Sequence, residues 1–156
     1  MAAPPASGLT PYNGPWTPNE ITHLLKRSLF GAGVADITHF QSKTLAATVS
    51  ELLTPASTAP PPPLKEYTTP TTALNPDGNI PQGTTWVNDP NTDGSVDSYR
   101  RASFKKWWMG IMVNQDRSLL EKMTLFWHNH FSTETNTVGN SQYVYKHHAM
   151  LRANAL

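Results

Sequence analysis

The sequence predicts an all-α fold, a helical bundle of five or six helices with one long, irregular, proline-rich insert. Three observations lead to this prediction. Apolar residues recur at helical spacing on both sides of residues 54–97, helix-starting motifs precede several of these stretches, and no apolar–polar alternation is long enough for a sheet. A chain of 156 residues can bury the core of one domain.

The N-terminal helices are expected within residues 16–53, after a flexible tail of residues 1–15 that is rich in proline, glycine and alanine. Thr17 can cap the first helix, Pro18 suits its first position, and Glu20 completes a capping box. One face of this helix should be buried. Its apolar residues at helical spacing are Ile21, Leu24, Leu25 and Leu29.

Two shorter helices should follow, because Gly31 and Gly33 end the first one. We expect them at residues 34–40 and 44–53, with Pro55 beyond the end of the second. The residues expected to face inward on the second of them are Leu45, Val49, Leu52 and Leu53.

The segment of residues 54–97 has a different composition, with nine of the fourteen prolines and few apolar residues. Such a segment buries too little surface to offset the entropy lost on ordering. We expect a long loop or insert that is extended and polyproline-like around residues 60–63.

Helical spacing returns at residue 98, and residues 98–156 should form the C-terminal helices of the same domain. Ser118 and Glu121 form a second capping box before the helix that carries EKMTLFWHNHF. The apolar face before it consists of Phe104, Trp107, Trp108, Ile111 and Met112.

A turn at residues 138–140 leads to a last helix, from about Ser141, which should run into the C-terminus. No glycine, proline or polar stop ends this helix. We therefore expect a chain that is truncated inside a helix, as a fragment of a larger protein.

The overall charge gives no reason to expect a nucleic-acid partner, since 12 basic and 11 acidic residues leave a formal net charge of +1. Without cysteine there are no disulfides and no thiolate metal sites. No apolar run approaches the roughly 20 residues of a membrane span. The start of the chain lacks the features of a signal peptide, which makes a cytoplasmic location the default expectation.

Four segments point to a known family. They are HLLKRSLFG (residues 23–31), WWMGIMV (107–113), EKMTLFWHNHFST (121–133) and YKHHAMLRANAL (145–156). In this order they resemble the bacterial domain of unknown function eighteen-hundred (DUF1800), in its N-terminal portion. The resemblance implies a mostly helical protein, considerably longer than this chain, whose remaining part packs on these helices. It implies no activity and no catalytic residue.

The stretch EKMTLFWHNHF contains candidate metal ligands. In a helix, His128 and His130 lie about 200° apart and share one ion only if the helix has already ended. Two interpretations stay open. In one, the histidines cap the helix or bond backbone carbonyls beside an aromatic core. In the other, His128, His130 and one of the pair His147 and His148, with His147 as the candidate, bind a metal with further ligands. Zinc, iron or manganese would suit such ligands.

The stretch DPNTDGSVDSYR (residues 89–100) resembles a calcium-binding loop of the EF-hand type over these twelve residues only. Arg100 stands at the last position, where a carboxylate should close the coordination sphere, so any calcium affinity should be weak. A plain turn is the alternative, because Asp-Gly steps are ordinary turn formers. The candidate calcium ligands are Asp89, Asn91, Asp93 and Asp97.

Two hypotheses about function follow from these patterns. The first is a helical scaffold or interaction module without catalysis of its own, because no acid–base or nucleophile set converges within the chain. The second is part of a metal-dependent enzyme, possibly a hydrolase, because four of the six histidines fall between residues 128 and 148.

Overall fold

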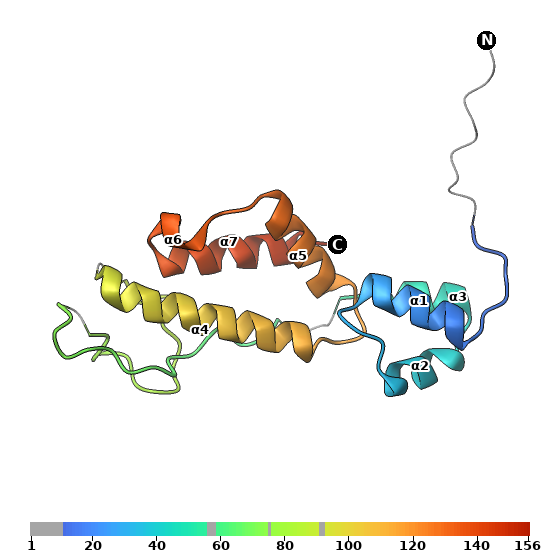
Figure 1. Cartoon of the computed structure of the whole chain (residues 1–156), viewed down its shortest axis with the longest axis horizontal. Helices are drawn as coiled ribbons and strands as arrows, with labels where there is room; N and C mark the ends of the chain where they lie inside the picture. Colours follow the sequence, from blue (N-terminus) through green and yellow to red (C-terminus); the bar gives the residue numbers. More distant parts are fainter. Residues whose placement is uncertain (1–10, 56–58, 75, 91–92) are drawn as a thin grey trace, which may run out of the picture.

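Seven helices make up the regular structure in the part of the chain that the computed structural model describes, residues 11–55, 59–74, 76–90 and 93–156 (Figure 1). These residues contain no strand, only an isolated antiparallel bridge between Leu64 and Thr85. The predicted all-α class is confirmed. The helices are α1 (Pro18–Ser28), α2 (Val34–Gln41), α3 (Leu45–Leu52), α4 (Gly94–Val113), α5 (Leu120–His130), α6 (Thr135–Val138) and α7 (Ser141–Ala153).

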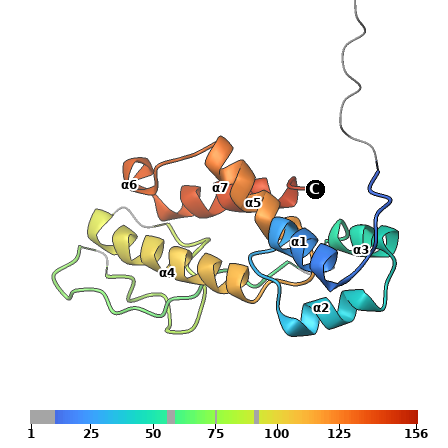
Figure 2. The ribbon, with the colours of Figure 1, turned by 45° about the vertical axis from the view of Figure 1, so that its right-hand side comes forward.

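Helices α1, α2 and α3 lie together at one end of the molecule (Figures 1 and 2). The capping box predicted for α1 is confirmed, because Thr17 accepts the Asn19 N–H and Glu20 accepts the Thr17 N–H at 3.0 Å. Its apolar face meets α2 and α3 in a small core, which we call the N-terminal cluster. The cluster contains Ile21, Leu25, Leu29, Phe40 and Leu52.

The buried face of α3 differs from the predicted one. Thr48 and Leu52 are buried, whereas Val49 and Leu53 are 37% and 52% exposed. Thr48 can be buried because its hydroxyl donates to the Thr44 carbonyl in the turn below, which leaves no unpaired polar group.

Helices α4, α5 and α7 form the larger body, in which α7 packs against both of the others. Their shared core, which we call the C-terminal cluster, is mainly aromatic, and its buried members are Ile80, Trp86, Val87, Phe104, Trp108 and Val144. The predicted apolar face of α4 supplies two of these. None of the described helices is long and apolar enough to cross a membrane.

Helix α4 begins at Gly94 and not at residue 98 as predicted. Asp93 is its N-cap and accepts the Ser95 N–H at 2.9 Å. The Asp-Gly step that predicts a turn therefore starts a helix, because Asp is also a strong N-cap residue.

The described residues between α3 and α4 form no helix, and several of them are packed against α4, which the composition of the proline-rich segment did not predict. Ile80, Trp86 and Val87 are at most 5% exposed and belong to the C-terminal cluster. These three apolar side chains anchor the segment in the core. The polar backbone groups of the segment also need hydrogen-bond partners, and α4 supplies some of them. Ser103 on α4, for example, donates to the Leu64 carbonyl at 2.6 Å.

The ends of α5 and α7 also differ from the predictions. Helix α5 begins at Leu120, and Ser118 accepts the Leu120 N–H at 3.2 Å, but Glu121 takes no part in a capping box. Its carboxylate turns to Arg152 on α7 instead. Helix α7 starts at Ser141 as predicted, with Asn140 as its cap, and ends at Ala153 rather than running into the C-terminus.

The two helical groups are joined by a few polar contacts. The Leu119 N–H donates to the Leu52 carbonyl at 2.7 Å, and Lys122 donates to the Leu29 carbonyl at 3.0 Å. Arg117 pairs with Asp36 at 2.8 Å. Each group keeps its own apolar cluster.

Candidate functional site

Helix α5 separates the two histidines of EKMTLFWHNHF. The helix continues to His130, so the alternative in which it ends near His128 does not hold. The His128 ring lies 4.8 Å from the Trp108 ring, toward the core. His130 is exposed and stacks on Phe126 at 6.2 Å. The structure thus does not bring His128 and His130 together.

His128 has a histidine neighbour on α7. The rings of His128 and His147 lie 6.0 Å apart between centroids, and the Thr133 hydroxyl lies 3.3 Å from Nδ1 of His147. Burial, and then the charge of His147, lower the pKa of His128. Both effects favour a neutral ring, the form in which imidazole binds metals and accepts protons.

His148 is fully buried in an aromatic cage. Its ring lies 4.5 Å from that of Trp108 and 5.4 Å from those of Phe104 and Trp107. Neither ring nitrogen has a hydrogen-bond partner among the described residues. Burial, followed by the charges of His128, Arg152 and His147, lowers the pKa of His148 to about 3. At neutral pH this ring is an uncharged part of the core.

The described residues contain no group of three or more His, Asp or Glu side chains placed to hold a metal ion. Trp108 contacts both His128 and His148. The metal site predicted from His128, His130 and His147 stays a prediction. Of these three residues, the structure brings only His128 and His147 close together.

The calcium-like stretch is divided between a loop and a helix. Asn91 lies outside the described residues. Asp93 caps α4, and Asp97 is buried in its first turn, where it accepts the Ser141 N–H at 2.6 Å and pairs with Arg101. The backbone carbonyl of Asp89 accepts a hydrogen bond from Nη1 of Arg100 at 2.5 Å. The calcium site stays a prediction, and the carboxylate of Asp97 is already engaged by Ser141 and Arg101.

Arg100, the residue that departs from the calcium pattern, has a structural role that no local sequence pattern indicates. It is fully buried and donates to both carboxylate oxygens of Asp77, at 2.9 and 2.6 Å. Tyr67 donates to the same carboxylate at 2.9 Å, and Lys65 donates to the Asp77 carbonyl at 2.6 Å. This polar cluster fixes the proline-rich segment on α4.

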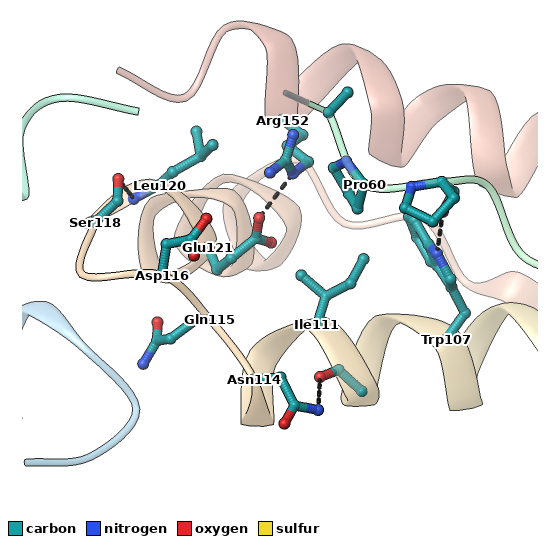
Figure 3. Close-up of a pocket in the computed structure, with 13 residues that line it drawn as sticks. Pro60, Trp107, Ile111, Asn114, Gln115, Asp116, Ser118, Leu120, Glu121 and Arg152 are labelled. Atoms are coloured by element: carbon teal, nitrogen blue, oxygen red, sulfur yellow. Dashed lines mark hydrogen bonds and ion pairs between the residues drawn. The ribbon is translucent and has the colours of Figure 1, made fainter. Parts of the chain in front are cut away.

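A cleft lies between the C-terminal half of α4, the start of α5 and α7, and the segment around Pro60 covers one side (Figure 3). Its larger part has a volume of about 440 Å³, and a neighbouring part of about 340 Å³ extends along α7 toward His148. Trp107 and Arg152 line both parts. Ligand sites are usually concave spaces of this size, roughly 300 to 1,000 Å³, with few polar groups.

The polar centre of the cleft is the ion pair of Glu121 and Arg152 (Figure 3). Nε of Arg152 donates to Oε1 of Glu121 at 2.7 Å. Glu121 is only 5% exposed, and its second oxygen, Oε2, has no hydrogen-bond partner among the described residues. The terminal nitrogens of Arg152 likewise have no hydrogen bond within the described chain.

The sequence signal for this pair is weak. Glu121 fits the capping-box pattern after Ser118, and that pattern explains the residue without a second role. Its seven-residue spacing to His128 places both on one face of α5, the face that meets α7. A carboxylate on the buried face of an aromatic helix was the available clue, because such a group needs a partner.

Comparison with known proteins gives a family and no activity. The family model described as protein of unknown function (DUF1800) matches residues 23–156. No curated protein and no solved structure matches the chain. The matched range contains the histidines of α5 and α7 and the residues of the cleft that follow α3.

Proposed function

Because the chain belongs to the DUF1800 family, whose description names no activity, we propose a function from the geometry of the cleft. The chain is a helical interaction module that holds a ligand between α4, α5 and α7.

The unpaired Oε2 of Glu121 carries this proposal. A buried acceptor without a donor destabilises a fold by about 1–3 kcal/mol, and more when it is charged. A ligand that donates a hydrogen bond to this oxygen removes that penalty. The cleft also has apolar walls from Trp107, Ile111 and Pro60, which favour burial of an organic group.

The indole N–H groups allow a direct test by NMR. Trp107 lines the cleft, and its indole donates to the Pro61 carbonyl at 2.6 Å. Trp16, near α1, donates to the Lys43 carbonyl at 3.0 Å and serves as the control. We expect at least one compound from a panel of amino acids, nucleosides, sugars and small organic acids to shift the Trp107 signal and leave that of Trp16 unchanged.

A substitution at Gly110 tests whether such a compound occupies the cleft. Gly110 lines it, and a Cβ added there meets no atom within 4 Å. Gly110→Leu should fill the cleft and abolish the shift, whereas the matched Gly110→Ala should retain it. If no compound moves the Trp107 signal, the chain does not bind ligands in this cleft and the proposal fails.

The second candidate, part of a metal-dependent enzyme, is supported by the His128–His147 pair. Two imidazole rings whose centroids lie 6.0 Å apart can share one ion when other groups complete the coordination. Metal analysis after incubation with zinc, iron or manganese tests this. His128→Ala should lose a metal that the control His130→Ala keeps, since His130 lies apart. A metal-free chain under these conditions removes the candidate.

A further inference from the structure

We propose that the ligand of the cleft is a small zwitterion, an α-amino acid with an apolar side chain. Its carboxylate would bind Arg152, and its ammonium group would bind Oε2 of Glu121. This inference rests on the proposed function and specifies its ligand.

The hydrogen-bonding groups of the cleft define two opposite requirements. Oε2 of Glu121 is a buried acceptor that needs a donor. The terminal nitrogens of Arg152 are donors without an acceptor in the described chain, and they suit the two oxygens of a carboxylate. The two side chains are held together at 2.7 Å, so one small molecule can reach both.

Charge balance selects a molecule that carries both charges. Glu121 and Arg152 form a neutral pair with side chains 6% and 16% exposed. A ligand with one charge would leave a net charge in this poorly solvated place, which is unfavourable. A zwitterion adds one charge of each sign. Asp116 also lines the cleft but is exposed, and it favours the ammonium end.

The rest of the cleft fits an apolar side chain. Trp107 and Ile111 project from α4, and Pro60 lies opposite, without a charged group among the three (Figure 3). The volume of about 440 Å³ accommodates a molecule of the size of leucine or phenylalanine.

Leucine and two blocked forms of it provide the test. The Trp107 indole signal is followed by NMR while L-leucine, N-acetyl-leucine or leucinamide is added to the whole chain. N-acetyl-leucine lacks the ammonium group, and leucinamide lacks the carboxylate. We expect leucine to bind at least about tenfold more tightly than either blocked form.

Variants assign the two charges to their partners. Glu121→Gln should weaken leucine binding at least about tenfold and leave the binding of N-acetyl-leucine nearly unaffected. Arg152→Gln should also weaken leucine binding at least about tenfold but leave the binding of leucinamide nearly unaffected. Glu66→Gln is the matched control, because its ion pair with Lys106 is exposed and neither of the two residues lines the cleft. If either cleft variant fails to fold, the comparison of blocked ligands and the loss of binding in Gly110→Leu decide the outcome.

Two results would overturn this inference. One is that neither leucine nor phenylalanine shifts the Trp107 signal. The other is that the blocked forms bind as tightly as leucine. If other compounds of the panel still bind in the cleft, the interaction module stands and only the ligand class is wrong. If none binds, both proposals fail.

Discussion

At the scale of single residues, His148 links the core to pH. Its pKa of about 3 lies below that of an unfolded histidine, so the unfolded state binds a proton first as the pH falls. Above about pH 6.5 the ring is neutral in both the folded and the unfolded state, so the titration of His148 takes nothing from the free energy of unfolding. Between about pH 6.5 and pH 3 the free energy of unfolding falls by about 1.4 kcal/mol per pH unit, because only the unfolded state binds the proton. The buried neutral ring therefore destabilises the protein in acid.

We expect His148→Leu to reduce this acid sensitivity and to stabilise the chain by about 1 kcal/mol or more at neutral pH, because it removes two unpaired buried nitrogens. Urea unfolding between pH 4 and 7 measures both effects. The exposed His23 provides the control, since His23→Leu should keep the pH dependence of the natural chain. An unchanged pH dependence in His148→Leu would show that another group causes it.

Asp77 is the second residue with a clear energetic role. Its carboxylate is the counter-ion of Arg100, and both side chains are 1% exposed. Asp77→Asn keeps the shape and tolerates the positive φ of 56° at this position, but it leaves the buried guanidinium without a negative charge. We expect a loss of about 3 kcal/mol or more in the free energy of unfolding.

The exposed pair of Glu66 and Lys106 gives the comparison for Asp77. Its side chains are 54% and 75% exposed, so Glu66→Gln should change the free energy of unfolding by less than about 1 kcal/mol. Denaturant unfolding of Asp77→Asn and Glu66→Gln measures the two losses in the free energy of unfolding. Equal effects would mean that the Asp77–Arg100 pair does not hold the proline-rich segment.

Single residues also show where sequence reasoning reaches its limit. The divergence of His128 and His130 was predictable, because helix geometry alone fixes it. The pairing of Glu121 with Arg152, and of Asp77 with Arg100, was not, because these partners are 31 and 23 residues apart. Such pairs depend on how the helices and the irregular segment pack, which no local pattern encodes.

At the scale of the elements, local signals placed the helices well wherever caps and periodicity agree. The α1 start at Thr17 and the α7 start at Ser141 are confirmed. The α4 start was missed because Asp93 and Gly94 suit a turn, a calcium loop and a helix cap equally. The packed proline-rich segment was missed because composition reports how many apolar residues a segment has, and not how deeply each is buried.

Calcium affinity tests the assignment of α4. Asp97 uses its carboxylate for the Ser141 N–H and for Arg101, and Asp93 uses its own for the first turn of the helix. We therefore expect no shift of the Gly94 amide signal in NMR up to several millimolar calcium. A saturable shift in that range would show that the first turn of α4 rearranges into a binding loop.

Gly110 offers a second test at this scale. It lies inside α4, and an added Cβ meets no atom within 4 Å, so Gly110→Ala should stabilise the chain by about 0.5–1 kcal/mol through helix propensity. Gly139 is the matched control, because its φ of 63° makes Gly139→Ala strained and destabilising. Urea unfolding gives both values, and a destabilised Gly110→Ala would indicate a side-chain clash in α4.

At the scale of the whole molecule, the N-terminal and C-terminal clusters are separate. The contacts between them include hydrogen bonds at Leu119 and Lys122 and the partly exposed ion pair of Arg117 with Asp36. A hollow of about 640 Å³, bordered by Leu29, Met112 and Leu125 among others, lies where the two groups meet. A contact of this kind couples two units weakly, because it shares little buried apolar surface.

Weak coupling predicts that the two groups open independently in native-state hydrogen exchange. Leu25→Ala removes a fully buried side chain from the N-terminal cluster and should lower the opening free energy of α1 amides by about 3 kcal/mol. The same variant should change that of α4 amides by less than about 1 kcal/mol. Val144→Ala in the C-terminal cluster is the matched variant and should show the reverse pattern. If each variant lowers both opening free energies equally, residues 16–53 and 98–156 unfold as one cooperative unit, and the polar contacts between them are stronger than their exposure indicates.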